Sequence, residues 1–122
     1  MNLEGLDHVA LSVADLERSE RWYTDVIGLE RVYADQWDGV PAFLMRNGSG
    51  VALFPASAGG EERAAIRILH FAFRVDRTTF EAAQARFREL GVEFRFSDHD
   101  VSHSIYLRDP DGHQVELTTY EL

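Results

Sequence analysis

The sequence predicts an α+β fold in which one βαβββ unit occurs twice. Two strand-like runs, 6–13 and 69–75, resemble each other, and each has a histidine near its start. A segment with apolar residues at helical spacing follows each run, and strand-like runs joined by turns come next. Half of a 122-residue chain buries too little surface to be stable alone, so we expect a single domain. The expected divisions are one domain over 1–122, a first unit at about 4–56, a connector at about 55–66 and a second unit at about 67–120.

The two predicted helices cover residues 15–27 and 78–90. Apolar side chains recur every three or four residues in both segments, and a glycine ends each one. Thr78 and Glu81 have the spacing of a capping box, which places the start of the second helix there. The strand pair that follows each helix aligns with its counterpart at a constant offset of 62 residues, the offset that also separates His8 from His70.

Composition excludes several classes of function. The net charge of −9 disfavours a nucleic-acid or anionic-membrane partner, because phosphates would be repelled. The chain has no cysteine, so disulfides, thiolate nucleophiles and cysteine zinc sites are excluded. No apolar run is long enough to span a membrane, and the first residues have no signal-peptide pattern. We therefore expect a globular cytoplasmic protein that acts on a small molecule.

Three candidate metal ligands occupy equivalent faces of the predicted strands. Side chains alternate along a strand, so His8, His70 and Glu116 point away from the helices while their apolar neighbours point toward them. The turn Asp109–Gly112 places Tyr106 across from Glu116 on the same face. Two imidazoles and a carboxylate form a site that leaves positions open for substrate. The alternative is that each histidine is a hydrogen-bonded structural residue and that Glu116 is a solvated charge.

The paired units, the two strand histidines and the segment "YLRDPDGHQVEL" together resemble the vicinal oxygen chelate superfamily. This superfamily includes glyoxalase I, fosfomycin-resistance transferases, bleomycin-resistance proteins and extradiol dioxygenases. The resemblance implies that the two units form an incomplete barrel around one cavity, with a divalent metal at its centre. It also implies that the metal ligands are His8, His70 and Glu116.

Two members of the superfamily fit this chain less well. Glyoxalase I has a fourth ligand at the repeat partner of Glu116, and the offset of 62 places Phe54 there and Leu44 opposite Tyr106. An apolar cavity wall is therefore expected, with Phe54, Leu44 and Ala10 as substrate-binding residues, and a glyoxalase-type lyase or isomerase is an alternative. Fosfomycin transferases have a polar residue two positions after the first histidine, where this chain has Ala10, and their substrate is anionic.

The extradiol dioxygenases give the closest local resemblance. Their signature runs from a histidine to an apolar–tyrosine pair, an acidic–proline turn, a glycine and the ligand glutamate, and His99, Tyr106 and Glu116 fall into that order. The resemblance implies Fe(II), with Mn, Ni or Zn as other divalent metals that suit the ligands, and a catecholic or other vicinal-oxygen substrate. Tyr106 and His99 would be catalytic, and His103 would line the cavity. Ring-cleaving enzymes carry a further histidine in the first unit, which is missing between His8 and His70.

The competing class is a metal-free binding protein of the bleomycin-resistance type, which the acidic charge and the aromatic content also suit. Such proteins normally lack the ligand triad, and its presence here favours a metal-dependent enzyme, which the resemblance to extradiol dioxygenases makes an oxidoreductase. We also expect a homodimer, because open sheets leave edges and apolar surface that a second copy can cover.

Overall fold

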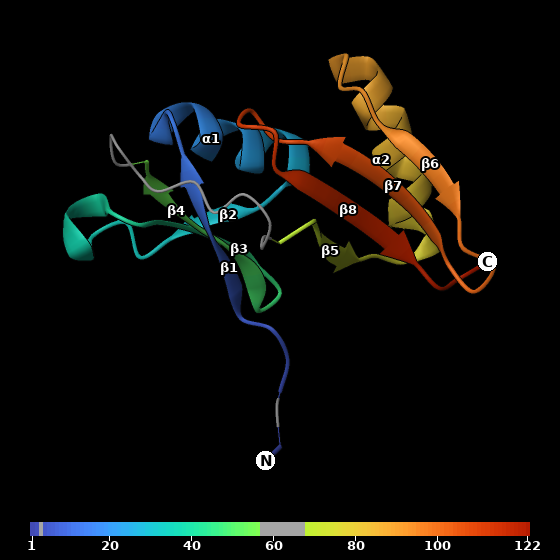
Figure 1. Cartoon of the computed structure of the whole chain (residues 1–122), viewed down its shortest axis with the longest axis horizontal. Helices are drawn as coiled ribbons and strands as arrows, with labels where there is room; N and C mark the ends of the chain where they lie inside the picture. Colours follow the sequence, from blue (N-terminus) through green and yellow to red (C-terminus); the bar gives the residue numbers. More distant parts are fainter. Residues whose placement is uncertain (3, 57–67) are drawn as a thin grey trace. The chain divides into compact units, whose positions relative to one another are not determined.

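The computed structural model describes residues 1–2, 4–56 and 68–122. The chain forms two compact units, Met1–Glu62 (unit 1) and Arg63–Leu122 (unit 2), and each is described by itself. Figure 1 shows the elements of both units along the chain. The connector expected at 55–66 lies almost entirely outside the described residues. That the two units make one domain stays a prediction.

Unit 1 has the predicted βαβββ order and forms a four-stranded sheet (Figure 1). The sheet order is β1-β4-β3-β2, in which β1 and β4 are parallel and the other neighbours antiparallel. A short 3-10 helix, η2, lies between β2 and β3. The elements are β1 (His8–Val13), α1 (Leu16–Trp22), η1 (Tyr23–Ile27), β2 (Glu30–Val32), η2 (Trp37–Gly39), β3 (Ala42–Arg46) and β4 (Ser49–Pro55).

Unit 2 repeats this arrangement with a longer helix. Its sheet order is β5-β8-β7-β6, again with one parallel pair, β5 and β8, and two antiparallel pairs. The elements are β5 (Phe71–Arg74), α2 (Arg77–Leu90), β6 (Arg95–Asp98), β7 (His103–Arg108) and β8 (Gln114–Thr119). Two four-stranded sheets with two helices confirm the predicted α+β fold class.

The helix ends follow from local sequence. The side chain of Asp15 accepts a hydrogen bond from the backbone nitrogen of Arg18, 3.1 Å away, and caps α1. The first helical segment changes to a π-helical turn, η1, and ends at Gly28 in the left-handed conformation. Asp76 caps α2 in the same way as Asp15 caps α1, so the capping box expected at Thr78 is wrong. The helix therefore starts one residue earlier than predicted.

In each unit the core lies between the sheet and its helix. In unit 1 the alternate residues Leu11 and Val13 of β1 and Leu53 of β4 are buried with Tyr23 of η1. In unit 2 Ile105 and Leu117 of neighbouring strands are buried with α2 side chains. This packing leaves the other face of each sheet, here called its open face, without a helix of the same unit to cover it.

The offset between the two units is not constant. It is 62 residues between the paired positions Ala10 and Ala72 and 64 residues between their neighbours Ala52 and Glu116. The partner of Ala52 in β3 is Phe43, so Phe43 corresponds to Tyr106. The offset grows by one residue between the first and second strands of the units and by one more between the third and fourth, because those connecting segments are longer in unit 2.

The changed offset corrects two expectations about the cavity wall. Leu44 is one residue away from the true counterpart of Tyr106, and one residue reverses the facing of a side chain. Leu44 is accordingly fully buried on the helix side, so its expected role in binding substrate is wrong. Phe54 is two residues from the counterpart of Glu116, so it keeps the open face, where it is exposed.

Candidate functional site

His70 and Glu116 form the centre of the candidate site. Glu116 lies in β8 opposite Ala72 of β5, and His70 comes just before β5. The Nε2 atom of His70 is 3.1 Å from the Oε2 atom of Glu116. Glu116 is only 7% exposed, yet it has no arginine or lysine partner among the ion pairs of the described residues. Two ligand-type side chains therefore converge on the open face of unit 2.

Tyr106 and His99 extend this group across the sheet. The register pairs Tyr106 of β7 with Glu116 of β8, as expected from the turn at 109–112. The hydroxyl of Tyr106 is 2.9 Å from Nε2 of His99, and the Tyr106 ring lies edge-on to the His70 ring at 5.7 Å. Unit 2 thus brings together four of the predicted site residues: His70, His99, Tyr106 and Glu116.

The electrostatic setting of Tyr106 makes it a hydrogen-bond donor. Burial raises the pKa of the Tyr106 phenol, and the charge of Glu116 and a hydrogen bond to that carboxylate raise it further. A phenol that keeps its proton donates to Glu116, so its oxygen is left to accept a hydrogen bond from Nε2 of His99. The hydrogen-bond network assigns this tautomer of His99.

His8 lies at the start of β1 in unit 1. Its Nδ1 atom is 2.8 Å from the Oδ2 atom of Asp7. A carboxylate on one ring nitrogen fixes the tautomer and the ring orientation, and it leaves Nε2 available as a metal ligand. Within either unit, as far as the structure describes it, no three His, Asp or Glu side chains gather closely enough to hold a metal ion. His8 and the pair in unit 2 belong to different units.

The side chains present fit a divalent cation by their chemistry. A nearly buried carboxylate whose polar neighbours are the imidazole of His70 and the phenol of Tyr106 lacks a charged partner, which a cation would supply. The donor set of neutral imidazole nitrogen and carboxylate oxygen suits iron, manganese, nickel and zinc. His8 of unit 1, oriented by Asp7, offers a nitrogen of the same kind.

Two further predicted residues are placed clearly by the strands. Ala10 lies on the open face of unit 1, two residues from His8 and opposite Ala52. Ala52, the true counterpart of Glu116, has no side-chain atom that can bind a metal. That Ala10 and Phe54 contact a substrate stays a prediction.

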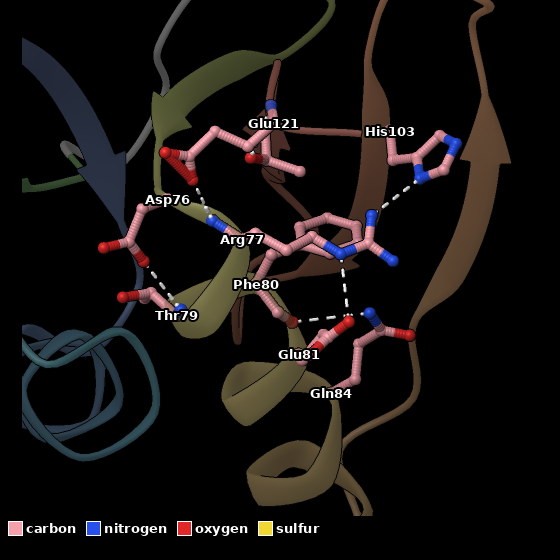
Figure 2. Close-up of polar contacts among 9 residues, drawn as sticks. Asp76, Arg77, Thr79, Phe80, Glu81, Gln84, His103 and Glu121 are labelled. Carbon is pink, nitrogen blue, oxygen red and sulfur yellow. Dashed lines mark hydrogen bonds and ion pairs between the residues drawn. The ribbon is translucent and has the colours of Figure 1, made fainter.

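His103 does not face the open side, and the expectation that it lines the cavity is wrong. Its Nδ1 atom is 3.1 Å from Nη1 of Arg77 at the start of α2, and Figure 2 shows its ring turned toward that guanidinium. Its Nε2 atom is 3.6 Å from Asp98 of β6. His103 is three residues from Tyr106 in the same strand, and an odd separation puts two side chains on opposite faces.

Sequence reasoning missed two residues of the site. Asp7 directly precedes His8, and an acidic neighbour of a candidate ligand was a usable signal. Arg95 of β6 pairs with Tyr106, and its guanidinium carbon lies 4.8 Å from the centre of the Tyr106 ring. The pairing of β6 with β7 is set by tertiary structure, so the sequence offered no direct signal for Arg95.

Comparison with known proteins assigns the family. The sequence model of the Glyoxalase/Bleomycin resistance protein/Dioxygenase superfamily matches residues 5–117. The chain belongs to this superfamily. The resemblance drawn from the strand histidines and the segment around Glu116 is thereby confirmed. No helix in the described part of the chain is long and apolar enough to cross a membrane.

Named members of the superfamily that resemble the chain are enzymes of several kinds. Catechol-2,3-dioxygenase of Bacillus subtilis is 32% identical over 92% of this chain, but the chain spans only 40% of that protein's length. Fosfomycin resistance protein FosX of Mesorhizobium japonicum is 32% identical over 96% of this chain and 86% of its own length. The crystal structure of a lactoylglutathione lyase from Agrobacterium tumefaciens matches with a TM-score of 0.76 at 26% identity, covering 98% of this chain and 96% of the other. These similarities show the superfamily, and they do not distinguish between the reactions of its members.

Proposed function

We propose that the chain is a metal-dependent, dioxygenase-like oxidoreductase that acts on a small catecholic or other vicinal-oxygen substrate. The observation that carries the proposal is the unbroken series of contacts on the open face of unit 2, from His70 through Glu116 and Tyr106 to His99. Imidazole and carboxylate provide ligands, and phenol and imidazole provide proton-handling groups beside them. The similarity to catechol-2,3-dioxygenase supports the choice of reaction.

The metal would be held by His8, His70 and Glu116, and we propose Fe(II). When bound, it supplies a Lewis acid that lowers the pKa of a substrate hydroxyl and holds two neighbouring oxygens. Asp7 orients His8 through its Nδ1 atom. Tyr106 would donate its hydroxyl proton toward a substrate oxygen, and as that proton leaves, the proton at Nε2 of His99 would replace it on Tyr106. The cytoplasmic homodimer expected from the sequence remains part of this proposal.

Metal titration by calorimetry tests the ligand set. Wild-type protein should bind one Fe(II) per chain under anaerobic conditions, and Glu116→Ala should weaken the affinity by on the order of 10²-fold or more, because second-shell changes alone cost 10–100-fold. Glu93→Gln, at an exposed glutamate of unit 2, is the matched control and should bind like wild type. Oxygen uptake with catechol then tests the reaction. Equal metal affinities for wild type and Glu116→Ala would favour the metal-free binding protein instead.

One observation favours a second candidate, a transferase acting on an anionic phosphonate. Arg95 places a positive charge beside Tyr106 on the open face, which the net charge of −9 gave no reason to expect. The similarity to glutathione transferase FosA of Serratia marcescens, which is 30% identical over 94% of this chain and 80% of its own length, points the same way. Titrating the metal-loaded protein with methylphosphonate separates the candidates. Saturable binding that Arg95→Gln weakens, without oxygen uptake on catechol, would select the transferase.

A further inference from the structure

An exposed group of aromatic rings covers part of the open face of unit 1. It consists of Tyr33 after β2, Trp37 of η2 and Phe43 of β3, here called the aromatic platform. The three ring centres are 5.6–5.9 Å apart, so every ring touches the other two. Tyr33 is 60% and Trp37 is 55% exposed. Large aromatic rings left uncovered in a cluster are typical of a ligand-binding surface.

The aromatic platform is continuous with the candidate metal ligand of unit 1. The Phe43 ring lies edge-on to the His8 ring, with the centres 4.8 Å apart. The strand register explains this contact, because Phe43 pairs with Ala52 and Ala52 pairs with Ala10, one pleat from His8. Phe43 also stands at the position that corresponds to Tyr106 in unit 2. A molecule bound at His8 would therefore lie beside the aromatic platform.

The backbone holds the platform in one arrangement. Tyr33 and Trp37 have positive φ angles of 56° and 53°, a conformation that is uncommon for bulky residues. Backbone hydrogen bonds from Gln36 to Tyr33 and from Val40 to Trp37 close the segment on itself. Arg31 donates to the carbonyl of Gly39 at 3.2 Å, which ties the end of the segment to the unit. Rings that are ordered before binding lose little conformational entropy when a ligand arrives.

The packing of the rings indicates what they bind. Quaternary ammonium ligands are recognised best in a cage of several aromatic faces, and rings in mutual contact leave no such cage between them. What remains is the outer surface of the rings, on which a further flat ring can stack or pack edge-on.

We propose that the aromatic platform binds the flat body of the substrate, and that it selects vicinal diols carrying a second ring over single-ring and aliphatic ones. This inference rests on the proposed function, since it places the chelating end of the substrate at His8. Tyr33 and Trp37 are then specificity-determining residues. Neither contributes a metal ligand or a proton-transfer group.

Fluorine NMR on protein labelled with 5-fluorotryptophan tests this directly. The chain has two tryptophans, so Trp22 of α1, which packs against Tyr23, is an internal control in the same unit. Titration with 2,3-dihydroxynaphthalene should shift the Trp37 resonance saturably and leave the Trp22 resonance in place. Catechol should need a concentration about 3- to 10-fold higher, which corresponds to one lost aromatic contact.

The variants Tyr33→Ala and Tyr120→Ala form a matched pair, because Tyr120 of unit 2 is similarly exposed at 53% but lies outside the platform. Tyr33→Ala should weaken binding of the naphthalenediol about 3- to 10-fold, and Tyr120→Ala should not. Equal effects of the two variants, or tighter binding of benzyltrimethylammonium than of the diol, would overturn the proposal.

Repeating the titration in metal-free protein tests the aromatic platform separately from the proposed metal-dependent reaction. A Trp37 shift there, with no Fe(II) binding to wild type, would refute the metal enzyme and leave the aromatic platform standing.

Discussion

The hydroxyl of Tyr106 and the Nε2 atom of His99 are 2.9 Å apart, and the strand register pairs Tyr106 with Glu116, whose carboxylate is nearly buried. One phenol thus connects a candidate metal ligand to a histidine that is exposed to solvent. This is the arrangement that a proton path needs, and it does not depend on Tyr106 touching the metal.

Tyr106→Phe should lower metal affinity by no more than about 10-fold, the lower end of a second-shell loss, and slow turnover by about 10²-fold, because it removes a hydrogen-bond donor and keeps the ring. Calorimetry measures the first quantity, and oxygen uptake with a vicinal diol measures the second. Tyr120→Phe is the control and should match wild type in both. A large loss of metal affinity in Tyr106→Phe would mean that the phenol holds Glu116 in place and has no role in proton transfer.

Ala52→Glu should add a fourth ligand to the metal site, since Ala52 is the structural counterpart of Glu116. We expect metal affinity to rise by about tenfold or more and dioxygenase activity to fall, because one open coordination position is filled. Phe54→Glu is the comparison, two residues further along the same face. If Phe54→Glu strengthened metal binding and Ala52→Glu did not, the register assigned to β4 would be contradicted.

Arg31→Met should destabilise unit 1 and loosen the segment that carries Trp37. Arg31 donates to Glu20 at 2.8 Å and to the carbonyl of Gly39, and both side chains of the ion pair are mostly buried. The free energy of unfolding should fall by about 1–2 kcal/mol, measured by urea denaturation, because Glu20 loses its partner. Arg46→Met removes an exposed pair with Glu30 at 3.6 Å and should cost less than about 1 kcal/mol. Equal losses in the two variants would show that the contacts of Arg31 stabilise unit 1 no more than an exposed ion pair does.

Gly50→Ala should disturb the pairing of β3 with β4. A side-chain carbon at this position would overlap the carbonyl oxygen of Leu44 in the neighbouring strand, which is backbone and cannot turn aside. Forcing atoms into such a space costs about 1–3 kcal/mol in the free energy of unfolding. Ser49→Ala, at the adjacent residue, is the control and should be nearly neutral. Wild-type stability in Gly50→Ala would mean that the two strands lie further apart.

The cap of α2 should make stability depend on pH. A hydrogen bond from the backbone of Thr79 lowers the pKa of Asp76 below its usual value of 3.8, so the folded state favours the charged carboxylate. This contribution is present above the pKa of the unfolded chain and is lost as the pH falls through the lower pKa of the folded state.

Asp76→Asn keeps a capping side chain without a titrating group. Its denaturation midpoint should therefore drop less than that of wild type between about pH 5 and about pH 2, a range that includes the usual aspartate pKa of 3.8. Asp76→Ala should have a lower midpoint than either protein at neutral pH. An identical acid dependence in wild type and Asp76→Asn would contradict the assignment of the cap.

The sequence by itself determined which side chains share a face. Alternation along a strand is a local property of the backbone, so the open-face positions of His70, Tyr106 and Glu116 followed from counting. Applied to His103, which stands an odd number of residues from Tyr106, the same count would have excluded it from the open face. The glycines that end both helices were equally readable, because the left-handed conformation at Gly28 and Gly91 is sterically easy only for glycine.

Tertiary structure decided which residues of different strands meet. The pairings of Glu116 with Ala72 and of Ala52 with Ala10 depend on the lengths of the segments between strands, and these differ between the two units. With a constant offset, the counterpart of Tyr106 was therefore assigned to Leu44, which lies in the core. The true counterpart is Phe43, which lies on the open face. The aromatic platform was hidden for the same reason. Its rings come from a strand and from the non-repeating segment before it, and only the folded backbone brings them together beside His8.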